Sequence, residues 1–268
     1  MKPLDDSFGS RVRRAVGMAT LYRNPLVAYG HRAGMVRHGT VTHRLRRGPA
    51  LTVDSGPADI RVINEIWLGG YAGDPGLIPH DGWTVVDLGA NKGIYAAWVL
   101  HHADAKVYCY EPDPRNYACL IENVGARVRH FNAAVGSNAG VVTLYQVPTG
   151  RALSSIVPGR LQARGTATVP IEVRLVAFKE VVETAGQIDL LKIDVEGAEY
   201  DILLGSTDDV FEPVRRIILE YDAVSPTDRD VTGHDLATRL RGLGFCVDEG
   251  LDSVAKGFGA RIMSAWKR

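Results

Sequence analysis

The stretch Asp87-Leu-Gly-Ala-Asn-Lys-Gly93 decides the fold. It overlaps the end of a short apolar run, residues 84–88, and precedes a helical pattern over residues 93–102. Glycine lets a backbone approach a ligand closely, and the first turn of a helix favours anions. A carboxylate at the strand end also suits a ligand with a positive group. We therefore expect a ligand-binding turn between a buried strand and a helix.

This turn matches neither of two common phosphate-binding motifs. The P-loop requires G-x-x-x-x-G-K-[ST], and the dinucleotide fingerprint requires G-x-G-x-x-G. Asn91 replaces the second glycine of that fingerprint, and no glycine lies where the third would fall. A nicotinamide dehydrogenase stays an alternative, although this chain lacks the glycines of the dinucleotide fingerprint. A strand-to-helix turn with no ligand is a second alternative.

Apolar runs and helical patterns alternate after residue 83. Strands are expected at 84–88, 106–110, 128–135, 188–193 and 216–220, and helices at 93–102, 114–124, 197–205 and 232–243. Such alternation indicates a parallel sheet with helices on both faces. Residues 245–247 and 261–266 are expected to pair antiparallel at the end of the chain. The predicted fold class is α/β: a doubly wound sheet, mostly parallel, with a terminal antiparallel strand.

The N-terminal segment differs in charge from the rest of the chain. Residues 1–50 hold ten basic and two acidic side chains, a net charge of +8, while the remaining 21 basic and 29 acidic side chains give −8. We expect helices at 8–22 and 25–37 and an extended segment at 50–70. Residues 1–60 are predicted to form a basic helical and extended segment for substrate selection or dimer contact. The alternative is that these charges are only the solvent-exposed face of a helix. Residues 61–268 form the main domain.

A long loop interrupts the alternation. Residues 140–145 and 169–175 look like strands, yet no helix lies between them. The connection, residues 148–168, is longer than most loops in compact domains, which favours a binding loop or lid. Within it, Ser154 and Ser155 are candidate substrate contacts, with ordinary loop serines as the alternative.

Polar residues follow the second and third strands. Glu111 lies 18 residues after Gly93, at the position where an acid accepts hydrogen bonds from ribose hydroxyls, and Pro112 ends the strand. Asn132 and the backbone near Ala133 end the third strand and are candidates for contact with adenine. A turn role for Asn132 is the alternative, because asparagine favours turns.

Acidic residues follow the fourth and fifth strands. Asp194 and Glu196 come after one strand, and Glu220 and Asp222 end the next. Carboxylates there can orient a hydroxyl group, remove its proton or hold a divalent cation. The predicted catalytic residues are Asp194, Glu196 and Glu220, and the predicted Mg²⁺ ligands are Asp194, Glu220 and Asp222. His234 is a further candidate for substrate contact.

The order of these motifs resembles the FkbM-type S-adenosylmethionine (SAM)-dependent methyltransferases. The resemblance covers residues 83–222 and rests on DLGANKG at 87–93, EPDP at 111–114, NAAVG at 132–136, SS at 154–155, KIDVEGAEYDIL at 192–203 and Glu220. It implies the class I methyltransferase (Rossmann-like) fold and SAM as the donor. By that resemblance, the methionine end of SAM meets Asp87, Gly89, Asn91 and Gly93, the ribose meets Glu111, and Asn132 lies near the adenine.

The resemblance also implies an oxygen acceptor. We expect methyl transfer by in-line displacement to a hydroxyl of a small molecule, a saccharide or a glycosylated or other natural product. No Asn-Pro-Pro-aromatic stretch, which amine-directed methyltransferases use, occurs in the sequence. An RNA methyltransferase that uses the basic arm and a non-catalytic scaffold of the same fold are the remaining alternatives.

Composition limits the remaining possibilities. Lys and Arg together equal Asp and Glu at 31 each, so the net charge indicates no nucleic-acid partner. The three cysteines form no CxxC and predict neither a disulfide framework nor a zinc site. No apolar run reaches the roughly 18 residues of a membrane span. A cytoplasmic protein is expected, with a homodimer through the basic arm as a hypothesis.

Overall fold

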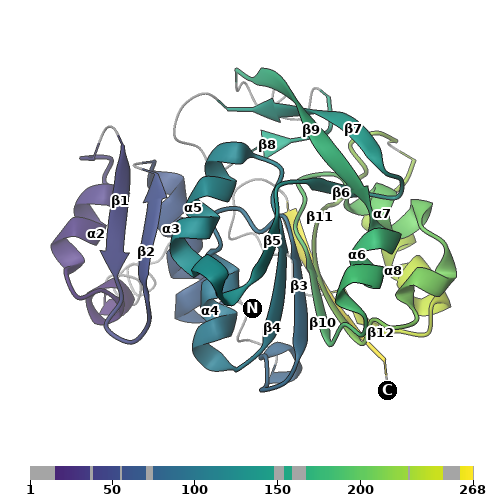
Figure 1. Ribbon diagram of the computed structural model, residues 1–268, viewed down its shortest axis with the longest axis horizontal. Helices are drawn as coiled ribbons and strands as arrows, with labels where there is room; N and C mark the ends of the chain where they lie inside the picture. The colour runs from purple at the N-terminus through teal and green to yellow at the C-terminus, as the bar shows by residue number, and fades with distance from the viewer. Residues whose placement is uncertain are drawn as a thin grey trace.

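The main sheet confirms the predicted fold class. The computed structural model describes residues 16–36, 39–54, 56–70, 75–147, 154–158, 167–228, 230–249 and 260–267. Seven strands lie in the order β12-β13-β11-β10-β3-β4-β5 (Figure 1). Neighbouring strands pair in parallel except around β13, which is antiparallel to both β11 and β12. The strands are β3 (Thr84–Leu88), β4 (Lys106–Tyr110), β5 (Arg129–Phe131), β10 (Leu190–Ile193), β11 (Arg216–Asp222), β12 (Cys246–Asp248) and β13 (Ala260–Trp266).

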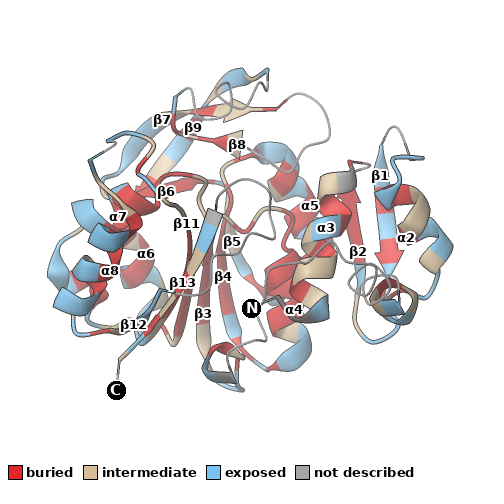
Figure 2. Ribbon diagram, turned by 180° about the vertical axis from the view of Figure 1, so that it is seen from behind, coloured by how far each residue is buried: buried red, intermediate tan, exposed pale blue. Residues whose placement is uncertain are grey.

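Helices cover both faces of this sheet, as expected for a doubly wound fold. Val85 and Val86 belong to two different buried clusters because successive strand side chains point to opposite faces. One face packs against α4 (Ile94–His102) and α5 (Pro114–Val124), and the other against α6 (Phe178–Ala185), α7 (Glu199–Gly205) and α8 (Gly233–Gly242). Figure 2 shows the strands of the sheet buried between these layers.

A second, four-stranded sheet begins where β5 ends. The predicted strand over 128–135 is interrupted at Asn132 and Ala133, so its two halves, β5 and β6, join different sheets. The second sheet has the order β6-β9-β7-β8 and contains β6 (Ala134–Gly136), β7 (Gly140–Gln146), β8 (Ser154–Ser155) and β9 (Val169–Ala177). The two strands predicted around the long loop are thus an antiparallel pair, β7 and β9. Figure 1 shows this sheet across one end of the main sheet.

The described residues of 16–70 form what we call the N-terminal unit. It contains a helical turn at 16–21, α2 (Pro25–Arg32), the hairpin β1 (Thr40–Arg44) and β2 (Ala50–Asp54), α3 (Pro57–Glu65) and a π-helical turn at Ile66–Gly70. The extended prediction for 50–70 is right for β2 and wrong for α3. There, Pro57 at the first helical position starts a helix whose Ile60 and Ile63 are buried.

The N-terminal unit shares a hydrophobic core with the main domain. Leu51 and Ile60 pack in the same buried cluster as Ile94 and Trp98 of α4. The predicted boundary after residue 60 falls within α3, and it stays a prediction.

Other elements differ from expectation mainly at their ends. The helix predicted at 25–37 ends at Arg32, and that predicted at 197–205 begins at Glu199. Helix α6 was not predicted. The capping box of α8 is as predicted, since the N–H of Thr232 donates to the Asp235 carboxylate at 2.7 Å. Short 3₁₀ turns lie at Pro75–Leu77, Gly125–Arg127 and Asp208–Phe211. Residues 8–15 of the first predicted helix lie outside the described residues, as do residues 148–153 and 159–166 of the predicted lid.

Candidate functional site

The loop between β3 and α4, residues 89–93, adopts a conformation that its sequence favours. Gly89, Asn91 and Gly93 have φ values of 77°, 51° and 73°, a left-handed region open to glycine and tolerated by asparagine. A Cβ on Gly89 would lie 1.9 Å from the carbonyl oxygen of Asp194. Glycine is therefore required at position 89, because it lets the loop rest directly on the end of β10. We call residues 89–93 the donor loop.

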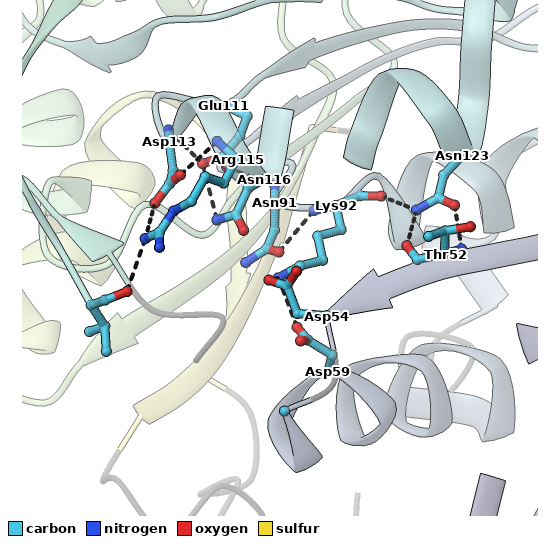
Figure 3. A network of polar contacts seen from close by, with 12 residues as sticks. Thr52, Asp54, Asp59, Asn91, Lys92, Glu111, Asp113, Arg115, Asn116 and Asn123 are labelled. Carbon is cyan, nitrogen blue, oxygen red and sulfur yellow. Dashed lines mark hydrogen bonds and ion pairs between the residues drawn. The ribbon is translucent and has the colours of Figure 1, made fainter. Parts of the chain in front are cut away.

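Glu111 lies beside the donor loop, just after β4. Its Oε2 accepts from the backbone N–H of Asn91 at 2.8 Å, and its Oε1 from that of Asp113 at 2.9 Å (Figure 3). Burial raises the pKa of Glu111 to about 7, although these N–H groups favour the charged form. The two motifs predicted to meet one ligand are thus hydrogen-bonded to each other.

Asn132 holds the turn that follows Glu111. Its Nδ2 donates to the carbonyl oxygens of Glu111 and Pro112 at 2.8 and 3.1 Å. Ala133 is buried directly after it. These bonds give Asn132 a structural role between β4 and β5, while the turn role and the contact of Asn132 and Ala133 with an adenine ring both stay predictions.

A buried lysine joins the first and fourth motifs. Nζ of Lys192 lies 3.1 Å from Oδ1 of Asp87 and 3.2 Å from Oδ2 of Asp194. Burial raises the pKa of Asp87, and attraction to Lys192 opposes that rise. When all three groups are charged they carry a net −1, which complements a positively charged ligand group.

Lys192 is not among the site residues predicted from the sequence, although the sequence contains a signal for it. Lysine is almost never fully buried unless it is paired. Lys192 stands inside β10, whose four residues are all buried, and the nearby carboxylates of Asp87 and Asp194 make that position tolerable. A lysine in an apolar strand two residues before a strand-end aspartate therefore predicts an ion pair.

The acidic residues at the ends of β10 and β11 do not form a metal site. No group of three or more His, Cys, Asp or Glu side chains in the described residues is arranged to hold a metal ion. Asp194 is paired with Lys192, and Glu220 is buried within β11. The Mg²⁺ ligand set predicted from Asp194, Glu220 and Asp222 is therefore not supported, and we assign no magnesium site.

Glu196 has an unusual backbone, with φ at 55°. Ser155 donates its hydroxyl to the carbonyl oxygen of Glu196 at 2.7 Å and accepts from the N–H of Val157 at 3.1 Å. Strand β8 of the second sheet is thereby attached to the turn that carries Asp194 and Glu196. This geometry gives buried Ser155 a protein partner, so the direct substrate contact predicted for it lacks support.

The other predicted substrate contacts have different surroundings. Ser154 is half-buried in β8, next to Ser155. His234 is exposed in the first turn of α8. Nearby, Gly233 packs so closely on Tyr221 that a Cβ there would lie 2.1 Å from its ring. Substrate contact by Ser154 or His234 stays a prediction.

These groups fit SAM, a nucleoside that carries a charged amino acid. Glu111 offers a carboxylate to ribose hydroxyls beside the donor loop. Asp87 is fully buried, and within the described part of the chain its Oδ2 has no hydrogen-bond partner. A buried acceptor of that kind is costly unless a ligand or water completes it. Asp87, the donor loop and Glu111 would hold the donor.

A family model decides between the alternatives. The model described as the methyltransferase FkbM domain matches residues 87–247, from the donor motif to β12. The chain belongs to the FkbM methyltransferase family. This confirms the resemblance and identifies the main domain as a methyltransferase domain, against a nicotinamide dehydrogenase.

Curated relatives of this chain are also methyltransferases. The 31-O-demethyl-FK506 methyltransferase FkbM of Streptomyces tacrolimicus is 29% identical and covers 64% of this chain and 76% of its own. The 2-O-methyltransferase NoeI of Sinorhizobium fredii is 30% identical, and the match covers 52% of this chain and 63% of NoeI. The hexuronic acid methyltransferase AglP of Haloferax volcanii is 27% identical (68% and 78%). The matches thus span about two thirds to three quarters of the relatives' lengths.

Other predictions are tested only in part. No helix among the residues that the structure describes is long and apolar enough to cross a membrane. The cytoplasmic location, the homodimer and the absence of a nucleic-acid partner stay predictions.

Proposed function

We propose that this FkbM family member is a SAM-dependent O-methyltransferase. Its acceptor is a hydroxyl group of a small molecule, a saccharide or a glycosylated or other natural product. The observation that carries the proposal is the hydrogen-bonded assembly of the donor loop, Glu111 and the Asp87–Lys192–Asp194 cluster at adjacent strand ends. The names of two relatives specify O-methylation, and a third specifies hexuronic acid.

Methyl transfer mainly requires the protein to align SAM and the acceptor hydroxyl. SAM supplies a methyl group on a positively charged sulfur, already activated for attack by an oxygen. Holding the two reactants in line is worth effective molarities on the order of 10⁵–10⁸ M. The donor loop and Glu111 hold one reactant, and we assign the other to the carboxyl ends of β10 and β11, the edge of such sheets where ligands bind.

A hydroxyl must lose its proton as the new C–O bond forms. We assign that proton to the acidic set Asp194, Glu196 and Glu220. Asp194 is the member best placed to act as base, because its side chain is 23% exposed while Oδ2 stays 3.2 Å from Lys192. Glu196 lies in the same turn, and Glu220 is buried at the end of the neighbouring strand.

The test is methyl transfer from isotope-labelled SAM to a panel of acceptors. The panel holds hexuronic acid oligosaccharides, hydroxylated natural products and a transcribed RNA. We expect label in an O-methyl group of a small molecule, identified by NMR. Asp194→Asn and Glu196→Gln should lower turnover while SAH, the product S-adenosylhomocysteine, still binds. Label in the RNA, label on nitrogen, or full turnover in both variants would contradict the proposal.

A further inference from the structure

Lys92 is the one donor-loop residue with a long charged side chain, and that side chain lies inside the N-terminal unit. It is 1% exposed, and its Nζ lies 2.9 Å from Oδ1 of Asp59 and 3.3 Å from Oδ2 of Asp54 (Figure 3). Asp59 belongs to the first turn of α3, and Asp54 ends β2. Two elements of the N-terminal unit therefore hold one residue of the donor loop.

A second bond set reaches the same residue through its backbone. Asn123 of α5 donates Nδ2 to the carbonyl oxygen of Lys92 at 2.7 Å and to that of Thr52 at 2.8 Å. Its Oδ1 accepts from the N–H of Thr52 at 2.7 Å. Lys92 is thus fixed at both its side chain and its carbonyl group, and strand β2 takes part in each contact.

The Lys92–Asp59 pair is more than a surface ion pair. Burial alone would lower the pKa of Lys92, but attraction to Asp59 and Asp54 outweighs burial and raises it. Burial raises the pKa of Asp59 to about 6, against the opposite influence of Lys92. A buried pair of this kind is often no more stabilising than apolar residues would be, so its geometry needs another explanation.

The backbone on either side of Lys92 supplies that explanation. Asn91 and Gly93 are both left-handed, and the N–H of Asn91 donates to Glu111. A short segment with alternating backbone conformations keeps its shape only when its surroundings determine it. Lys92 is anchored directly between these two residues, next to the N–H of Asn91 that donates to Glu111.

We propose that Lys92 is a positioning residue for donor binding, and that the N-terminal unit, through Asp59 and Asp54, is a working part of the donor site. This inference rests on the proposed function. It gives Asp54 and Asp59 a role beyond acceptor choice or dimer contact, the roles predicted from sequence for residues 1–60.

The test compares three variants of the full-length protein by calorimetric titration with SAH and by thermal unfolding without ligand. Lys92→Met removes the charge, and Asp59→Asn removes only the ionic part of the contact at constant size. Tyr22→Phe is the matched control, because it removes a 2.8 Å hydrogen bond to Asn64 within the same unit and leaves the donor loop untouched.

We expect the Kd for SAH to rise about 30-fold in Lys92→Met and about fivefold in Asp59→Asn, because a donor loop without its anchor must be ordered when the ligand binds. Tyr22→Phe should lower Tm yet leave Kd within twofold. Wild-type affinity in a folded Lys92→Met would overturn the inference. If that variant does not fold, wild-type affinity in Asp59→Asn overturns it. Equal loss of affinity in Tyr22→Phe would also overturn it, by showing general destabilisation. Failure of the wild type to bind SAH would instead contradict the proposed function.

Discussion

Two regions of this molecule contact the donor loop, and one of them is much easier to predict from the sequence than the other. On one side lie Asp87, Glu111 and Asp194, each at the end of a strand of the main sheet. On the other side lies the N-terminal unit, with Asp54 and Asp59 on Lys92. The first region follows from strand topology, because carboxyl ends of parallel strands meet at one edge. The second depends on where an added unit docks, which no local pattern specifies.

The largest effect is expected from Gly89, where the main-sheet side admits no side chain. A Cβ in Gly89→Ala would overlap the carbonyl oxygen of Asp194, so the donor loop must move. Because the displaced loop no longer has its binding conformation, we expect the Kd for SAH to rise at least about 100-fold in calorimetry. The control is Gly82→Ala, which has a similar φ of 80° but no atom within 4 Å of the added Cβ. This control should lose only the stability that corresponds to its backbone strain, and it should bind SAH with wild-type affinity. Equal affinity in the two variants would refute the close packing of loop on strand.

Next in size is the loss of the buried lysine. Lys192→Met leaves two neighbouring carboxylates without their cation, which costs about 3–5 kcal/mol and lowers Tm by on the order of 10 °C. Differential scanning calorimetry measures the change. Lys179→Met is the control, because its contact with Glu183, at 4.0 Å, is exposed and worth little. Similar Tm values for both variants would mean that Lys192 does not hold this cluster together.

The predictable and the unpredictable parts of the site differ for physical reasons. The strands of the main sheet, α4, α5 and the donor loop follow from apolar runs of fixed period and from glycines at turns, and they are predicted from the sequence. Lys192 and Lys92 were missed because a buried lysine is explained only by partners far along the chain. Helix α3 is predicted as extended because Ile60-Arg-Val-Ile fits both periods. Packing against α2 and β2 in the shared buried cluster decides between them.

The acidic residues predicted at the ends of β10 and β11 also have a predictable and an unpredictable part. Proximity of the strand ends was predictable, but the identity of each carboxylate's partner was not. Ser155 illustrates this, because its bond to Glu196 depends on how the second sheet folds over the turn.

A pH effect of about tenfold is expected from Glu111. Its folded pKa, about 7, lies above the ordinary 4.5, so the folded protein binds this proton more tightly than the unfolded chain does. The contribution of Glu111 to the free energy of unfolding therefore falls as pH rises from about 4.5 to 7. The ionised form is the better acceptor for ribose hydroxyls, so SAH affinity should rise about tenfold from pH 6 to 8. Glu111→Gln should abolish that dependence in titrations at both pH values. Its persistence would assign the proton to another group.

The smallest effect concerns the link from the second sheet. Ser155→Ala removes the hydroxyl that fixes the left-handed Glu196, so we expect kcat to fall about fivefold with SAH affinity unchanged, roughly the worth of one hydrogen bond. Ser154→Ala in the same strand is the control and should keep kcat. A rise in KM for the acceptor with constant kcat would instead support the direct substrate contact predicted for Ser155.

The most direct test of the whole account is calorimetric titration of the wild-type protein with SAH, beside Gly89→Ala. We predict micromolar binding at one site per chain, and loss of that binding in the variant. An absence of binding by folded wild-type protein would contradict the donor site. Equal binding by both proteins would place the ligand somewhere other than the loop at 89–93.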